Sequence, residues 1–243
     1  QATNAKKTNN GKGPLFTEST EILTKAFSHR ENDFNEYKDQ TLLPHMFSKS
    51  GPFISSADVN QDGMEDFFVG GASGQAGAFY LSLNGKLVGK STVAFEADKN
   101  LEDIGSVFFD ADGDKHLDLY VVSGGSEFPD GAEQYRDRLY FNDGKANFTQ
   151  SEKMNTRSSG SCVIAFDFEG DGDLDLFRGG QVVPNSYPKS PKSYLFINDK
   201  GKFTDQIKTL APQLSEIGMV NSASWVDLDG DKKSELVVVG EWM

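Results

Sequence analysis

Four stretches of the chain place acidic side chains at alternating positions and could bind a cation. Each is nine residues long with an acid or an amide at positions 1, 3, 5 and 9, and they begin at Asp58, Asp110, Asp167 and Asp227. Oxygen ligands, mostly carboxylate, suit a hard cation, Ca²⁺ before Mg²⁺. Alternation around a tight turn lets several of these side chains converge on one point. We therefore predict up to four Ca²⁺ sites, because solvated acidic turns would not keep the same spacing four times.

The predicted metal ligands are the side chains at positions 1, 3, 5 and 9 and the backbone carbonyl at position 7. They are Asp58, Asn60, Asp62, Met64 and Asp66 in the first loop, Asp110, Asp112, Asp114, His116 and Asp118 in the second, Asp167, Glu169, Asp171, Asp173 and Asp175 in the third, and Asp227, Asp229, Asp231, Lys233 and Glu235 in the fourth. His116 is expected to be a passive loop residue and not a transition-metal ligand. The alternative cation loop, the EF-hand, needs a bidentate acid at position 12 and flanking helices. Position 12 is valine or arginine here, and the flanks are β-branched and aromatic.

The acidic loops recur at intervals of 52, 57 and 60 residues, which indicates a repeat architecture. Each loop lies between two apolar stretches that read as strands, such as "SVFFD" and "LDLYVV" around the second loop. Asn-Gly and Asn-Asp-Gly turns then predict a third and a fourth strand. The closing strands are expected at "VAFEAD", "ANFTQSE" and "GKFTDQI". We predict an all-β fold, a β-propeller of four-stranded antiparallel blades with Ca²⁺-binding loops between the first and second strands, as part of a larger propeller.

The polar start of the chain, "QATNAKKTNNGKG" at residues 1–13, is predicted to be a linker or a disordered segment. Residues 14–243 are predicted to form three full blades with partial blades at both ends. "PLFTEST" at residues 14–20 is expected to be the closing strand of a leading blade. Residues 21–45 are expected to be an extended excursion with a helical turn, in which His29 and His45 have structural roles and no metal-like neighbours.

Composition excludes several classes of partner. The formal net charge is −13 and the chain holds 37 acidic residues, so it is a poor candidate for nucleic acid or for an anionic membrane surface. One cysteine permits no internal disulfide. No apolar stretch approaches the ~20 residues of a membrane helix, so a membrane anchor would lie outside this chain. No oligomer is implied.

The acidic hairpins, together with the "VGG" and "NDG…F" signatures, resemble FG-GAP and VCBS repeats. These repeats form the β-propellers of integrin α-subunits and of many bacterial extracytoplasmic proteins. The stretches "LLPHMFSKSGPFISSADVNQDGMEDFFVGGASGQ" and "VVVGEWM" are similar to repeat proteins of Bacteroidetes related to the ASPIC/UnbV group. The resemblance covers about residues 14–243 and implies that the hairpin acids are Ca²⁺ ligands. Two loops depart from the pattern, since Lys115 and Lys232 stand at position 6, where glycine is usual.

Two function classes follow from these features. The first is a calcium-binding interaction or adhesion module for a protein or a glycan, located in the periplasm, at the cell surface or in the secreted fraction, where free Ca²⁺ suits extracellular modules. The alternative is a catalytic or non-catalytic part of a polysaccharide-processing enzyme. The chain shows no Ser/His/Asp order, HExxH or phosphate loop, which favours the first class.

Long loops on the face opposite the acidic loops are the predicted ligand surface. Aromatic and arginine side chains on loops held by a rigid scaffold are typical of binding surfaces. We predict that Tyr135, Arg138, Arg178 and Tyr187 are exposed and line one patch where two neighbouring blades meet. The alternative is that these loops only pack against neighbouring blades.

Overall fold

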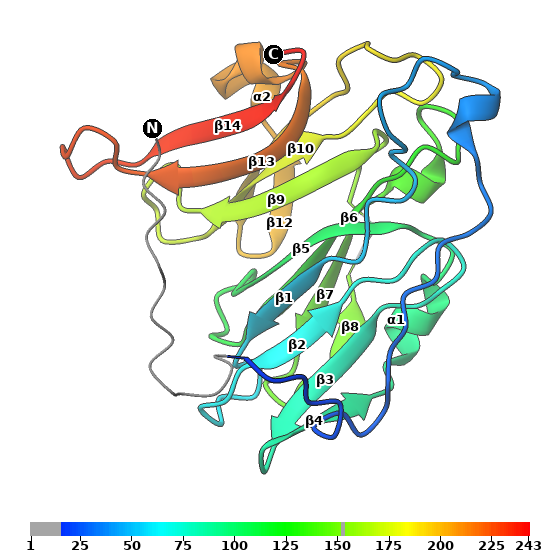
Figure 1. Ribbon diagram of the computed structural model, residues 1–243. Helices are drawn as coiled ribbons and strands as arrows, with labels where there is room; N and C mark the ends of the chain where they lie inside the picture. The colour runs from blue at the N-terminus through cyan, green and yellow to red at the C-terminus, as the bar shows by residue number, and fades with distance from the viewer. Residues whose placement is uncertain (1–15, 152–153) are drawn as a thin grey trace, which may run out of the picture.

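The computed structural model describes residues 16–151 and 154–243 as a succession of antiparallel sheets (Figure 1). Three sheets have four strands in chain order, and the last has two. The strands are β1 Ile54–Ala57, β2 Asp66–Val69, β3 Ala78–Leu83 and β4 Lys86–Lys90; β5 Asp103–Phe109, β6 Asp118–Ser123, β7 Arg138–Asn142 and β8 Phe148–Gln150; β9 Gly160–Phe166, β10 Asp175–Gly180, β11 Tyr194–Asp199 and β12 Lys202–Asp205; and β13 Met219–Val226 with β14 Glu235–Glu241. The described residues form an all-β fold without a closed propeller.

Short helical turns connect these sheets. They are η1 Glu36–Lys38, α1 Val93–Ala97, η2 Glu133–Tyr135, α2 Ile207–Leu210 and η3 Pro212–Leu214. Within the described part of the chain, no helix is both long and apolar enough to cross a bilayer.

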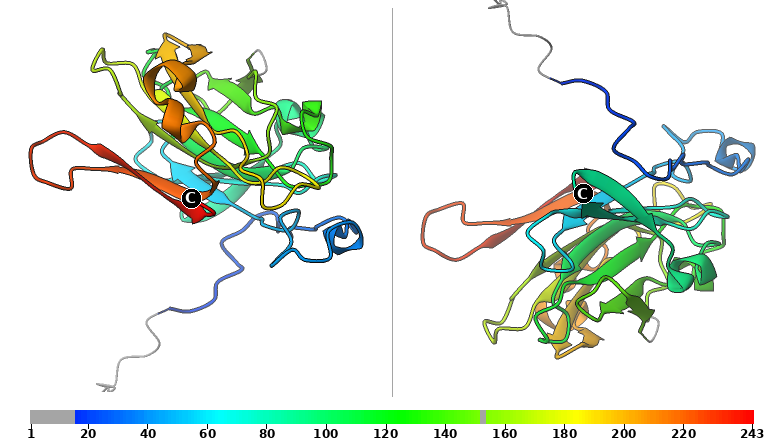
Figure 2. Two further views of the ribbon diagram at one scale, coloured as in Figure 1. Left: turned by 90° about the horizontal axis from the view of Figure 1, so that it is seen from above. Right: turned by 90° about the horizontal axis from the view of Figure 1, so that it is seen from below.

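Each acidic loop joins the first two strands of its sheet, as the alternation of acids and spacers predicts. The acid at position 9 is the first residue of the second strand, and it pairs with the residue just before position 1 in all four sheets. These pairs are Ala57↔Asp66, Phe109↔Asp118, Phe166↔Asp175 and Val226↔Glu235. The fourth loop, between β13 and β14, projects away from the other sheets (Figure 2).

The first strands of consecutive sheets are neighbours, so that β1 lies beside β5, β5 beside β9 and β9 beside β13 (Figure 1). The hydroxyl groups of Ser55 and Ser106 lie 2.6 Å apart across the first of these junctions. Apolar side chains fill the spaces between the sheets. The three clusters contain Phe68, Phe79, Leu119 and Tyr140; Tyr120, Leu139, Val163 and Tyr194; and Phe177, Leu195 and Val220. Burial of each such side chain contributes about 1.5–3 kcal/mol, so these clusters hold successive sheets together.

One predicted closing strand is wrong. "VAFEAD" contains the helix α1, and the fourth strand of the first sheet is β4, which pairs with β3 directly after the tight turn at Asn84 and Gly85. A two-residue hairpin turn pairs the residues on either side of it at once, so the closing strand cannot begin eight residues later. Phe95 of α1 is instead packed edge-on against Phe68 and Tyr140. The closing strands predicted around Phe148 and Phe203 are present as β8 and β12.

The predicted leading strand is absent from residues 16–20, which have no regular structure, and the rest of it lies outside the described residues, as does the predicted linker at 1–13. The chain instead meets the first sheet through a parallel bridge between Leu23 and Leu87. The predicted helical turn within residues 21–45 is η1. Glu36 of η1 is 2 % exposed and accepts the backbone N–H groups of Phe47 and Ser48, which anchors this excursion.

Candidate metal centres

The four acidic loops share one backbone conformation, although two of them lack glycine at position 6. Positions 4 and 6 of every loop have a positive φ, between 60° and 99°. Position 4 is Gln61, Gly113, Gly170 and Gly230, and position 6 is Gly63, Lys115, Gly172 and Lys232. Positive φ is unfavourable for lysine. Two lysines nevertheless adopt it, so the surrounding side-chain contacts impose the loop shape.

The acid at position 1 makes the contacts that curl each loop. In the second loop, Asp110 accepts the backbone N–H of Gly113 on Oδ1 at 2.8 Å and that of Lys115 on Oδ2 at 2.9 Å. The position 1 acids of the other loops accept N–H groups from the same part of their loops. A carboxylate has about four lone-pair sites, so each oxygen that accepts one backbone bond can still bind a cation.

The acid at position 9 ties the loop to the sheet. Asp118 is 1 % exposed, and its two oxygens accept the N–H groups of Ala111 at 2.9 Å and Asn142 at 2.8 Å. The first and third loops repeat this pair of bonds. Burial raises the pKa of Asp118 to about 7, and the negative charges of Asp112 and Asp114 act in the same direction. A cation among these carboxylates would favour their charged forms.

Convergence of the acids differs between the loops. In the second loop, the side chains of Asp110, Asp112 and Asp118 each bring an oxygen within 4.8 Å of the others. The fourth loop brings positions 1, 3 and 9 together in the same way, with Asp227, Asp229 and Glu235. Among the residues that the structure describes, the acids of the first and third loops do not converge to this degree.

The acid at position 5 serves the loop backbone in this structure. Asp114 Oδ1 accepts the N–H of His116 at 2.8 Å, and its other oxygen lies 3.0 Å from the Nδ1 atom of the same histidine. Asp62, Asp171 and Asp231 make the equivalent bond to the N–H at position 7. The position 5 acids therefore orient position 7, whose backbone carbonyl is a predicted ligand.

Comparison with protein families agrees with this geometry. Residues 58–121 match the model of the FG-GAP-like repeat, and the matched segment runs from the first acidic loop through the second. Residues 58–121 are therefore an FG-GAP-like repeat. No curated protein matches it.

The loop conformation predicts a cost for a β-carbon at Gly172. Its φ is +99°, and a Cβ built there meets no atom within 4 Å, so the penalty is purely conformational. We expect Gly172→Ala to lower the free energy of unfolding by about 1–2 kcal/mol, measured by urea denaturation. Gly74, with the same φ and the same open surroundings, lies outside the acidic loops. Gly74→Ala should lower the free energy of unfolding by the same amount, but only Gly172→Ala should also reduce the stabilisation by added Ca²⁺. Equal stabilisation of the two variants by Ca²⁺ would contradict the assignment of this loop as a calcium site.

The prediction that the ligand patch is exposed is wrong. Tyr135 is fully buried, and its hydroxyl donates to the carbonyl of Phe128 at 2.7 Å. Arg138 is 3 % exposed and forms an ion pair with Asp103 at 2.7 Å. Their partners are Asp103 in β5 and Phe128 in the loop between β6 and β7. The sequence pattern does not reveal these contacts.

Arg178 and Tyr187 are also committed to contacts within the chain. Arg178 lies in β10, all of whose residues are buried, and pairs with Asp137 at 3.0 Å. Tyr187 is half-buried beside Phe47, and its hydroxyl accepts a hydrogen bond from Trp242 Nε1 at 2.9 Å. The four side chains therefore do not form one exposed patch.

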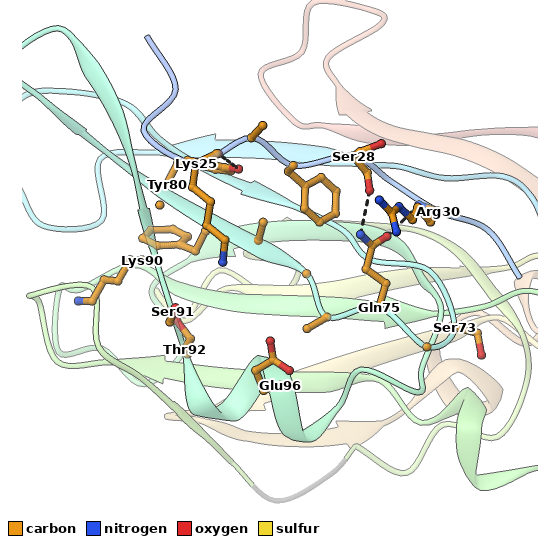
Figure 3. A pocket seen from close by; sticks show the side chains of 18 of the residues that line it. Lys25, Ser28, Arg30, Ser73, Gln75, Tyr80, Lys90, Ser91, Thr92 and Glu96 are labelled. Carbon is orange, nitrogen blue, oxygen red and sulfur yellow. Dashed lines mark hydrogen bonds between the residues drawn. The ribbon is translucent and has the colours of Figure 1, made fainter. Parts of the chain in front are cut away.

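A cleft that the sequence did not indicate opens beside the first sheet (Figure 3). Its volume is about 780 Å³, and it is lined by residues from 25–32, 73–80 and 89–96. Gln75 holds two of these segments together, because its side chain accepts the N–H of Arg30 and donates to the carbonyl of Ser28, both at 2.9 Å. The lining segments are far apart in the chain, so no local motif could have identified this cleft.

Proposed function

We propose that this chain is built of FG-GAP-like repeats and is a calcium-binding, adhesion-type module that works outside the cytoplasm and binds a glycan or a protein. The observation that carries the proposal is the positive φ at positions 4 and 6 of all four acidic loops, which lie at the same place in four sheets. We also propose that the sheets are blades of a larger β-propeller. The adjacency of the first strands supports this, because the innermost strands of a propeller surround its axis.

The donor set of the loops fits Ca²⁺. The second loop offers the carboxylates of Asp110, Asp112, Asp114 and Asp118 and the backbone carbonyl of His116, all of them oxygen donors. Ca²⁺ takes 6–8 oxygen ligands in flexible geometry, whereas Mg²⁺ demands near-ideal octahedral geometry. Hydrogen bonds to the backbone already orient the acids at positions 1 and 9, which lowers the entropic cost of binding the ion.

Calcium would also offset the net charge. Four bound ions would add eight positive charges and bring the formal net charge of the chain from −13 to −5. Loops of this kind need free Ca²⁺ of order 10⁻⁴–10⁻³ M, as found for extracellular modules. We therefore propose an extracytoplasmic location.

The cleft supports the binding part of the proposal. Three cationic side chains, Lys25, Arg30 and Lys90, line it together with the aromatic ring of Tyr80. Cationic and aromatic groups in one concave surface suit an acidic glycan or an acidic peptide. Glu31 and Glu96 also line the cleft, so its three cations exceed its acids by one. On a chain with a net charge of −13, this local excess of positive charge favours an anionic ligand at the cleft over the rest of the surface.

A glycan array tests this proposal. The wild-type protein in about 1 mM Ca²⁺ is expected to retain acidic glycans and release no product from them. A Lys25→Ala/Arg30→Ala double variant changes two exposed side chains. It should keep its stability within about 0.5 kcal/mol per site and lose more than about 1 kcal/mol of binding energy if either side chain is a hot spot.

The matched control is Lys189→Ala/Lys208→Ala, which removes two exposed cations away from the cleft. It should bind as the wild type does. Equal losses in both double variants would show nonspecific charge attraction, and release of shortened glycans would favour the enzyme class instead.

A further inference from the structure

A second group of potential metal ligands lies away from the acidic loops. His29 and Glu31 come from the long segment before β1, and Glu102 immediately precedes β5. One ligand atom from each of the three side chains lies within 4.8 Å of the others. His29 Nε2 and Glu31 Oε1 are 2.7 Å apart, with side-chain exposures of 10 % and 22 %. The group therefore combines one imidazole with two carboxylates in a largely buried place.

Glu102 supplies the independent sign that a ligand belongs there. The residue is 1 % exposed, and its Oε2 atom accepts the N–H of Ser73 at 2.6 Å. Within residues 16–151 and 154–243, its Oε1 atom is buried and accepts no hydrogen bond. Leaving a buried acceptor unsatisfied costs about 1–3 kcal/mol, and more for a charged group.

Several acids lie near Glu102, and a cation bound there would neutralise their negative charge. Burial raises the pKa of Glu102 to about 9, and the negative charges of Glu127, Glu31 and Asp103 act in the same direction. Burial likewise raises the pKa of Glu127. The group of potential ligands contains one imidazole, that of His29, and two carboxylates, those of Glu31 and Glu102. Its acidic side chains therefore outnumber its basic one.

The imidazole of His29 is oriented for binding through Nε2. Its Nδ1 atom faces the carbonyl of Gly70 at 3.4 Å, which is the contact that commonly fixes the ring of a metal-ligating histidine. The backbone of Gly51 packs closely on the ring, since a Cβ there would lie 3.0 Å from Cε1. The ring is thus held with Nε2 toward the carboxylate of Glu31.

We propose that His29, Glu31 and Glu102 bind one first-row divalent transition ion of the Zn²⁺ class, at a site chemically distinct from the acidic loops. Imidazole with carboxylates suits Zn²⁺, whereas Ca²⁺ takes oxygen ligands only. Three protein ligands leave one coordination position for water or for a donor atom of a ligand. The site borders the cleft, because Glu31 and Ser73 line it.

The ion would join the excursion before β1 to the sheets. Two hydrogen bonds already hold this segment against the loop that follows β2: the Gln75 side chain donates to the carbonyl of Ser28 and accepts the N–H of Arg30. Asn32 adds a contact of 3.4 Å to Glu127. A metal bound to His29 and Glu102 would cross-link the segment before β1 to the residues just before β5, where Glu102 already accepts the N–H of Ser73 from the loop after β2. It would also complete one wall of the cleft.

Equilibrium dialysis of the whole chain with Zn²⁺, in about 1 mM Ca²⁺ to occupy the acidic loops, tests the proposal. The wild type is expected to bind one Zn²⁺ and to melt at a higher temperature with Zn²⁺ than without it. His29→Gln and Glu102→Gln should each weaken Zn²⁺ binding by more than about 10-fold. His29→Gln keeps the experiment decisive should Glu102→Gln fail to fold.

The two other histidines provide matched controls. His45→Gln and His116→Gln should leave the affinity for Zn²⁺ unchanged, although His116 lies beside the acidic Asp114. The proposal is overturned if the wild type binds no Zn²⁺ in the presence of Ca²⁺, because His29 and Glu31 then only form a hydrogen bond with each other. It is also overturned if His29→Gln retains the wild-type affinity or if His116→Gln abolishes binding.

Discussion

Replacement of Arg178 by alanine is expected to lower the free energy of unfolding by about 3–5 kcal/mol, because it leaves a buried carboxylate without its partner. Arg178 and Asp137 are both fully buried, and the Nε atom donates to Asp137 Oδ2 at 3.0 Å. Burial alone would lower the pKa of Arg178, but the charge of Asp137 outweighs it and the pKa is raised. The guanidinium therefore stays charged, and its removal exposes the full cost of burying the acid.

Arg178 also connects two sheets, which adds to the expected loss. Its terminal nitrogens donate to the backbone carbonyls of Ser123 at 3.3 Å and Ser158 at 2.6 Å. The ring of Tyr194 lies against the guanidinium, 5.4 Å from centroid to Cζ. These contacts join β10 to the end of β6 and to the segment before β9.

Urea denaturation of Arg178→Ala and Arg157→Ala measures this effect with a matched control. The side chain of Arg157 is 43 % exposed and pairs with Glu133 on the surface. Its loss should lower the free energy of unfolding by at most about 1 kcal/mol. Equal changes in the two variants would show that the buried pair contributes no more than a surface pair does.

Chelation of Ca²⁺ with EGTA is expected to lower the melting temperature by about 5–10 °C for each occupied site. Binding to the folded state alone stabilises it by about 2.7 kcal/mol per independent site at a ligand concentration 100 times Kd. For a domain of this size, 1 kcal/mol corresponds to about 2–4 °C. Without metal, the carboxylates of each loop repel one another, and added Ca²⁺ should restore the melting temperature.

Two controls make the chelation experiment specific. Mg²⁺ should restore less stability than Ca²⁺, because it demands tight octahedral geometry. Asp112→Ala removes one of the three converging acids of the second loop and should lower the calcium stoichiometry by one. An unchanged melting temperature after chelation, with metal analysis confirming removal, would contradict calcium binding by these loops.

The sequence by itself determined the features that depend on neighbours along the chain. Alternating acids followed by an apolar run placed the loops between the first and second strands. The acid at position 9 has to be the first residue of the second strand, because only there can its side chain accept a hydrogen bond from the loop. The tight-turn residues located the third and fourth strands for the same local reason. Two predictions of this kind are wrong: the leading strand, of which residues 16–20 have no regular structure, and the closing strand at Phe95. The latter is wrong because the tight turn at Asn84 and Gly85 pairs β3 directly with β4.

The tertiary structure decided every contact between segments that the chain brings together from afar. Arg178 meets Asp137 across 41 residues, and this partner turned a predicted surface residue into a buried link between sheets. His29 and Glu102 belong to different segments with no shared spacing, and the cleft beside them draws on three such segments. Local propensity and hydrophobic pattern carry information over a few residues only. Which polar side chains become buried, and with which partners, therefore depends on how the sheets pack.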